Sequence, residues 1–184
     1  RKFMTLASSL ALGAGCLLNS GTVLSAYKAN SLEHSIDAYI KRLRRKGVIR
    51  PDERTAWSIY DFNTGKKLVS INENVTYQSA SMIKPFVALA YFYKVQQDGK
   101  RYKYTPKIRR KMEAMIKSSS NSATNYVMRL VSNKPVDQRP KEVERILKKN
   151  APGIFRDTRI VEYIPRGGKT YRNKASASDY SRFL

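Results

Sequence analysis

The chain has 184 residues, which is enough for one domain with a sizeable apolar core. It carries 36 Lys and Arg residues against 14 Asp and Glu, a formal net charge of +22. Such a charge favours an anionic partner, although a solvated basic surface is the simpler explanation. No phosphate-binding glycine loop or RNA-binding signature accompanies it, so no nucleic acid is expected as a partner. One His and one Cys argue against a His/Cys metal site and a Ser-His-Asp triad. No metal and no cofactor is therefore expected.

The first 26 residues have the layout of a secretory signal peptide. A positive start precedes an apolar run from Phe3 to Leu18, and small polar residues follow up to Ala26. The run is too short to favour a transmembrane span. Cys16 follows a Gly-Ala-Gly segment that loosely resembles a bacterial lipoprotein cleavage site, so a lipoprotein signal is an open alternative. We expect a periplasmic or otherwise extracytoplasmic protein whose catalytic domain spans residues 27–184.

Hydrophobic periodicity predicts a helix and then a hairpin in the first part of this domain. The helix covers 30–48 and ends at Gly47, and its apolar positions are Leu32, Ile36, Tyr39, Ile40 and Leu43. Two strands, 56–61 and 66–71, are joined by the turn residues 63–65 and form an antiparallel hairpin.

Helices without further strands are predicted for the remainder. Residues 82–95 are apolar nearly all round, which indicates a buried helix, and Pro85 sits where a missing N–H is tolerated. The segment 156–168 is irregular. Three more helices are predicted, over 106–117, 123–131 and 140–149. The apolar face of the first consists of Ile108, Met112, Met115 and Ile116, and that of the third of Val143, Ile146 and Leu147. Ser176 and Asp179 are predicted to form a capping box for a last helix.

Ser81 and Lys84 stand three residues apart at the start of the apolar helix. Residues at this spacing share a helix face, so the hydroxyl and the amine can meet. A desolvated lysine has a lowered pKa and can accept the proton of a serine nucleophile. Ser-x-x-Lys is common by chance, and a lysine that extends to solvent from an ordinary first turn is the alternative reading.

The context of this pair resembles the class A β-lactamases and penicillin-binding proteins, whose motifs are S-x-x-K, S-D-N and K-T-G. "WSIYDFNTGKKLVSINENVTYQSASMIK" is similar to that family's strand, turn, strand and nucleophile helix. "MIKSSSNSATNYVM" is similar to its S-D-N segment, with Ser120 in place of the Asp. A weaker similarity is found in "TRI" at 158–160, "IP" at 164–165 and "NKASASDY" at 173–180. These segments correspond to the family's Ω-loop region, which leads into its next helix. The resemblance covers residues 56–184.

The resemblance implies a role for each matching residue. Ser81 is expected to be the acylated nucleophile, with its backbone N–H in the oxyanion hole, and Lys84 its proton partner. Ser119 is expected to relay a proton to the leaving nitrogen, and Asn121 to bind the substrate and orient Lys84. A polar helix cap is the alternative for Ser119 and Asn121.

The pattern also departs from that of the family. Glu162 is the only acid near the position of the family's deacylating Glu, and its neighbours do not match, so it is carried over weakly. Without that Glu the acyl-enzyme would persist. The interval between Lys84 and Ser119 is also shorter than is typical. Lys169-Thr170 precedes the last helix and is not interpreted as K-T-G, which is expected beyond Leu184.

The resemblance implies an α+β fold: an α/β/α sandwich with an antiparallel sheet, plus a helical domain. This chain is expected to lack the C-terminal strands and helix of that fold. The leading hypothesis is an exported monomeric serine hydrolase that opens β-lactam rings through an acyl-enzyme. The alternatives are a penicillin-binding D-Ala-D-Ala carboxypeptidase or transpeptidase acting on cell-wall peptide, and a catalytically silent basic protein that binds an anionic envelope surface.

Overall fold

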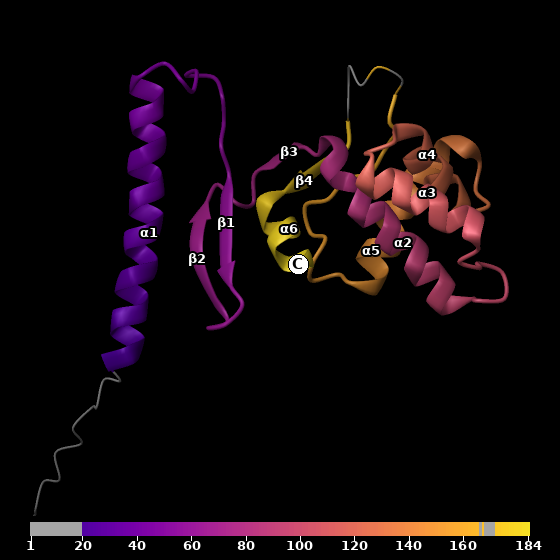
Figure 1. The fold of residues 1–184 in the computed structure, drawn as a ribbon, viewed down its shortest axis with the longest axis horizontal. Coiled ribbons are helices and arrows are strands. Elements are labelled where there is room, and N and C mark those ends of the chain that lie inside the picture. The colour runs from indigo at the N-terminus through magenta and orange to yellow at the C-terminus, as the bar shows by residue number, and fades with distance from the viewer. Residues whose placement is uncertain (1–19, 166, 168–171) are drawn as a thin grey trace, which may run out of the picture.

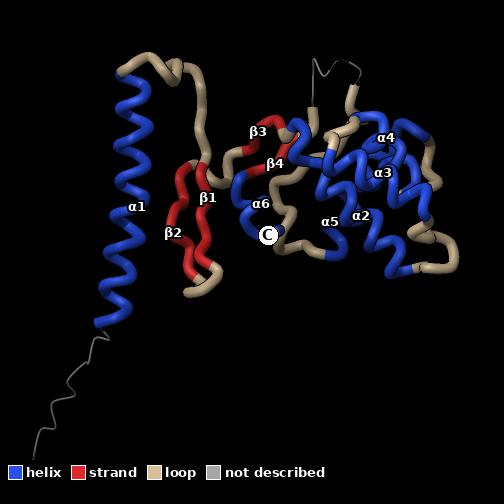
Figure 2. The backbone as a smooth tube through the Cα atoms, in the orientation of Figure 1, coloured by secondary structure: helices blue, strands red, loops and turns tan. Residues whose placement is uncertain are grey.

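The computed structural model describes residues 20–165, 167 and 172–184. The structure is mainly helical and contains two small antiparallel sheets, which confirms the predicted α+β class (Figures 1 and 2). In chain order the elements are α1 (Ser20–Arg45), β1 (Trp57–Asp61), β2 (Lys66–Ile71), β3 (Thr76–Gln78), the 3₁₀ helix η1 (Ala80–Ile83), α2 (Lys84–Gln97), α3 (Pro106–Lys117), α4 (Asn121–Leu130), the 3₁₀ helix η2 (Val136–Gln138), α5 (Arg139–Asn150), β4 (Lys174–Ser176) and α6 (Ala177–Phe183).

The expected leader lies largely outside the described residues, and so does Cys16. Export and lipidation therefore stay predictions. No helix in the described part of the chain combines the length and the apolar character that a membrane span requires.

Helix α1 begins earlier than the sequence predicts and ends at Arg45, two residues before the predicted Gly47. Gly47 has a φ of +70°, which a residue without a Cβ adopts at little cost. Its N–H donates to the carbonyl of Arg44 at 3.0 Å, and the N–H of Val48 donates to that of Leu43 at 3.0 Å. These two bonds form a Schellman motif, which satisfies carbonyls that the last turn leaves free.

The buried face of α1 is narrower than the predicted apolar stripe. Ile40 is 6% exposed, whereas Tyr39 is 48% exposed and Leu32 is 37% exposed. The prediction that Tyr39 and Leu32 face the core is wrong, because α1 packs chiefly against β2 and a two-stranded ribbon covers only a thin strip of the helix.

The predicted hairpin is present and lies between helices. Strands β1 and β2 pair in antiparallel register from Trp57 opposite Ile71 to Asp61 opposite Lys66. Gly65 closes the turn with a φ of +65°. Helix α1 packs against β2 and α6 packs against β1, so the hairpin is covered on both sides (Figure 1).

A second ladder, β3–β4, is not predicted by the sequence. Tyr77 pairs with Ala175 in an antiparallel register of three residues per strand. The expectation that no strand follows the hairpin is therefore wrong, since three-residue strands are too short to show an alternating pattern. Immediately after β3, the Ser79 N–H donates to the carbonyl of Asn173 at 3.0 Å. The ladder thus fixes the chain just before Ser81.

Helix α2 forms the centre of the helical region and contacts α3, α4 and α5. The Phe86 ring is fully buried and packs against the rings of Phe155, Tyr180 and Phe183, with centroid distances of 4.7–5.1 Å. On α3, Met112 and Met115 are buried as predicted. Ile116, expected on the same face, is 51% exposed, because α3 contributes only the strip that faces α2 and α4.

A buried carboxylate joins α6 to the irregular segment before β4. Asp179 is fully buried and accepts hydrogen bonds from the N–H of Asp157 at 3.0 Å and the hydroxyl of Thr158 at 2.6 Å. Arg182 donates a third at 2.5 Å. Half of the predicted capping box is present, because Ser176 accepts the Asp179 N–H at 3.0 Å while the Asp179 carboxylate points to the loop instead.

We expect Asp179→Asn to lower the free energy of unfolding by about 2–3 kcal/mol, because it removes a buried charged acceptor and places an amide donor among three donors. Urea denaturation measures this effect. Asp137→Asn, at an exposed position of η2, is the control and should change stability by less than about 0.5 kcal/mol. Equal effects from both substitutions would contradict a structural role for the Asp179 carboxylate.

Candidate active site

Three segments of the chain meet at the Lys84 amine. Lys84 is the first residue of α2, Ser81 lies in η1, and Ser119 and Asn121 lie where α3 gives way to α4. The Lys84 Nζ donates to Ser81 Oγ at 2.9 Å, Ser119 Oγ at 2.7 Å and Asn121 Oδ1 at 3.0 Å. It also donates to the Ser119 carbonyl oxygen. The structure thus brings together the four residues predicted from the S-x-x-K and S-x-N motifs.

The surroundings of Lys84 disfavour its charged form. The residue is 2% exposed, and no carboxylate among the described residues pairs with its amine. Burial therefore lowers the pKa of Lys84 from its ordinary value. The four oxygens stabilise the amine only as neutral dipoles, so part of the lysine can be unprotonated at a lower pH than a solvent-exposed lysine. An unprotonated Nζ at 2.9 Å from Ser81 Oγ can accept the serine proton.

The two serines of the site are also connected directly. The Ser119 hydroxyl donates to Ser81 Oγ at 3.0 Å, and the same Ser119 oxygen accepts from Lys84. Because a hydroxyl both donates and accepts, this triangle gives a proton two routes between nucleophile and base.

Left-handed backbone conformations place both serines. Ala80 has a φ of +45° and Ser119 a φ of +51°, values that residues with a Cβ rarely adopt. The turn at Ala80 leads from β3 into η1 and positions Ser81. The turn at Ser119 lets its hydroxyl and its carbonyl oxygen reach the same amine. Such strain is concentrated at functional sites, where the surrounding packing sustains it.

Ser120 caps α4 and frees its neighbours for the site. Its hydroxyl accepts the N–H of Ala123 at 3.2 Å, which satisfies one of the unpaired donors of the helix start. The alternative reading of Ser119 and Asn121 as helix caps is therefore not supported, since Ser120 performs that role. The replacement of the family's Asp by Ser at 120 retains a side chain suited to capping.

Glu162 does not join this cluster. Its carboxylate forms an ion pair with the Arg172 Nε at 2.8 Å and accepts the Arg172 N–H. Burial raises the pKa of Glu162, but the hydrogen bonds and charge of Arg172 outweigh that effect and lower it overall. Asn173 also holds the Glu162 backbone, accepting its N–H at 3.2 Å and donating to its carbonyl at 3.0 Å. The carboxylate is thus committed to a structural pair.

Sequence reasoning missed Asn125, which connects the site to the loop that carries Glu162. Its amide donates to the Ile164 carbonyl at 2.8 Å and accepts the Ile164 N–H at 2.9 Å. Asn125 lies one turn after Asn121 on α4, and this repetition of Asn at i and i+4 is the signal that could have indicated it.

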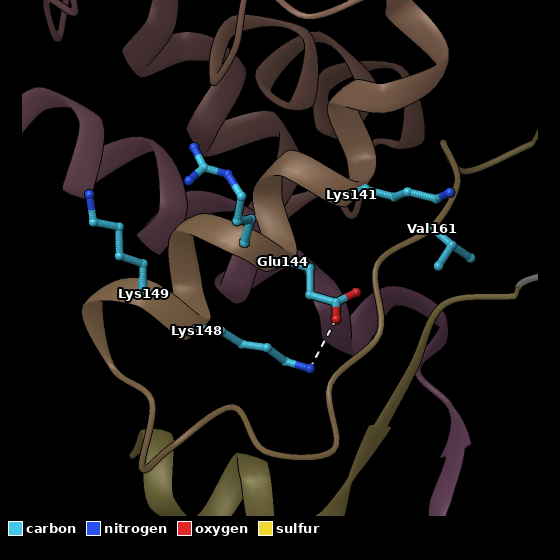
Figure 3. A pocket seen from close by; sticks show the side chains of 6 residues that line it. Lys141, Glu144, Lys148, Lys149 and Val161 are labelled. Carbon is cyan, nitrogen blue, oxygen red and sulfur yellow. Dashed lines mark ion pairs between the residues drawn. The ribbon is translucent and has the colours of Figure 1, made fainter.

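A hollow of about 620 Å³ on α5 is lined by none of the site residues. Figure 3 shows Glu144 at its centre, facing Lys148, while Lys149 points away from it. Glu144 accepts from Lys148 at 2.9 Å and from the Ile160 N–H at 2.9 Å. Its carboxylate therefore joins α5 to the loop. The lining residues are Lys141, Glu144, Arg145, Lys148, Lys149 and Val161.

A serine and a buried lysine at the start of an apolar helix, joined by a second serine and an asparagine, resemble the site of the β-lactamase-like serine hydrolases. Residues 36–113 match the family model Beta-lactamase2, described as a beta-lactamase enzyme family. This match confirms the predicted family resemblance. It includes Ser81 and Lys84 and ends before Ser119, which is placed at the site by the structure alone. No curated protein matches the chain.

Lys84 makes a testable contribution to the pH dependence of stability. Between its lowered native pKa and the ordinary value of 10.5, the unfolded chain binds more protons than the native one, so stability rises with pH. We expect Lys84→Met to abolish this rise in urea denaturation between pH 7 and 10.5. Lys141→Met, at an exposed position of α5, is the control and should retain it. Parallel curves for the native protein and Lys84→Met would show that Lys84 titrates normally.

Proposed function

We propose that this protein is an exported serine hydrolase that opens the β-lactam ring of its substrate through an acyl-enzyme on Ser81. The observation that carries the proposal is the buried Lys84 amine, 2.9 Å from Ser81 Oγ and 2.7 Å from Ser119 Oγ. The family match over residues 36–113 supports the same class of chemistry. Export rests on the sequence of the first 26 residues.

In the proposed acylation, the unprotonated Lys84 amine accepts the Ser81 hydroxyl proton as Oγ attacks the lactam carbonyl carbon. The new C–O bond produces an oxyanion, which the Ser81 N–H stabilises. That N–H lies in the first turn of η1, where no intrahelical acceptor exists. The C–N bond of the ring then breaks, and its nitrogen receives the proton from Lys84 through the Ser119 hydroxyl. Water later cleaves the ester and releases the opened acid.

The second candidate is a penicillin-binding enzyme that acts on the D-Ala-D-Ala end of cell-wall peptide. The pairing of Glu162 with Arg172 favours it, because a carboxylate in an ion pair with a lowered pKa is a weak base for activating water. The same Ser81, Lys84 and Ser119 would perform the acylation. The difference between the two candidates lies in how long the ester persists.

Acylation can be measured directly with a fluorescent penicillin. We expect one equivalent of label on Ser81 in the native protein and none in Ser81→Ala. Lys84→Met should lower the labelling rate by about 10²–10⁴-fold, because the general base is lost. Ser122→Ala alters an exposed serine three residues past Ser119 and is the matched control, with an unchanged rate expected. Labelling of Ser81→Ala at the native rate would refute the acyl-enzyme.

Release of that label tests Glu162. We expect Glu162→Gln to leave the deacylation rate within about twofold of the native one, because the carboxylate is already occupied by Arg172. Arg172→Gln is the companion variant, which frees the carboxylate and should speed release if Glu162 can reach the ester. A loss of about 10²-fold or more in Glu162→Gln would instead assign deacylation to this residue.

A further inference from the structure

Many cations of this basic chain lie against aromatic rings. Among the described residues there are six cation–ring contacts within 6 Å. An aromatic ring orders a cation without neutralising it, whereas a carboxylate cancels its charge. Cations held by rings therefore keep their charge available to an external anion.

Three of these contacts involve cations of α3 and α4. Lys107 and Lys111 of α3 both lie over the Tyr126 ring of α4, at 5.9 and 5.6 Å from its centroid. Arg129, almost one turn after Tyr126, lies 5.7 Å from the centroid of Tyr163. We call Lys107, Lys111 and Arg129 the α3–α4 basic face. None of the three forms an ion pair with a carboxylate in the part of the chain that the structure describes.

Helix geometry aligns these charges. Lys107 and Lys111 are separated by one turn, which is about 6 Å along the axis of α3. Helices α3 and α4 pack against each other, and Figure 1 shows them side by side. The one acid of α3, Glu113, pairs with Arg109 at 3.2 Å and is therefore already committed to another cation. The basic face is therefore a row of positive charge without an internal counterion.

We propose that the α3–α4 basic face binds a linear phosphate polymer. Lysine ammonium groups act as point charges for phosphate, and an arginine adds a fork that suits phosphate oxygens. A membrane surface fits less well, because Ile116, the large exposed apolar residue of α3, follows Lys107 by nine residues, or two and a half turns, and so lies on the opposite side of the helix. Nucleic acid fits less well because each of the two rings of this face, Tyr126 and Tyr163, already has a cation over it where a base would stack.

The position of this face gives the binding a consequence for the enzyme. The same two helices lead into Ser119 and Asn121, and Tyr126 lies five residues after Asn121, about 7.5 Å along α4. A polymer held there would keep the Ser81 site next to an anionic surface. Binding does not depend on acylation, so Ser81→Ala should bind the polymer like the native chain.

The test compares two double variants that remove equal charge. Poly(glycerol phosphate) is the probe, and its affinity is measured by calorimetry across a range of salt concentrations. We expect Lys107→Gln/Lys111→Gln to weaken binding about tenfold or more and to flatten the log–log salt dependence by about 1.5. Lys141→Gln/Lys149→Gln, on the hollow of α5, is the control and should change affinity less than about twofold. Equal losses in both variants would show binding to net charge alone and would overturn the proposal.

Two further probes separate the possible sources of phosphate. A single-stranded oligonucleotide of matched charge should bind no more tightly than poly(glycerol phosphate), because cations already lie over the Tyr126 and Tyr163 rings. Vesicles that contain anionic phospholipid should bind more weakly than the polymer. Markedly tighter binding of the oligonucleotide, or of the vesicles, would overturn the assignment to a linear phosphate polymer. Native-like unfolding midpoints for both double variants would exclude misfolding as the cause of a loss.

Discussion

The structure depends most on how it buries the amine of Lys84 without a carboxylate. A charged ammonium removed from water is costly unless it is compensated, and here only neutral oxygens surround it. Three segments must supply those oxygens at once, from η1, from the turn before α4 and from α4 itself. The same arrangement that makes the charged lysine unfavourable makes the neutral one available as a base. The burial of Lys84 without a carboxylate therefore determines both how these segments must fold and how the lysine can act as a base.

The rest of the fold holds those segments in place. The β3–β4 ladder fixes the chain before Ser81, and the apolar side of α2 anchors Lys84 through the ring of Phe86. Asn125 joins α4 to the loop that follows α5, and Asp179 joins that loop to α6. The Asp179 carboxylate is fully buried, the Asn125 amide is half-buried, and both have their hydrogen-bond partners, which keeps the irregular segment in a single conformation. Outside this framework, some of the basic side chains lie against aromatic rings, among them Lys107, Lys111 and Arg129.

Patterns within single segments were predictable, because local periodicity and capping chemistry determine them. The second strand of the hairpin and helix α3 have the predicted bounds, and Ser81 and Lys84 were found from their spacing and context. The ladder formed by β3 was not predictable, since its partner is about one hundred residues away and both strands are short. The exposed Ile116 was misassigned because periodicity shows that a helix is amphipathic without showing how wide a strip its neighbours cover.

The sequence by itself determined the elements and the chemical types at the site: a serine, a lysine, a second serine and an asparagine. Only the tertiary structure decided which of the candidate groups meet. It brought Ser119 and Asn121 to Lys84 and gave the helix cap to Ser120, and it committed Glu162 to Arg172. The physical reason is that covalent spacing limits contacts within one helix. Contacts between helices depend on how buried polar groups across the whole domain find their partners.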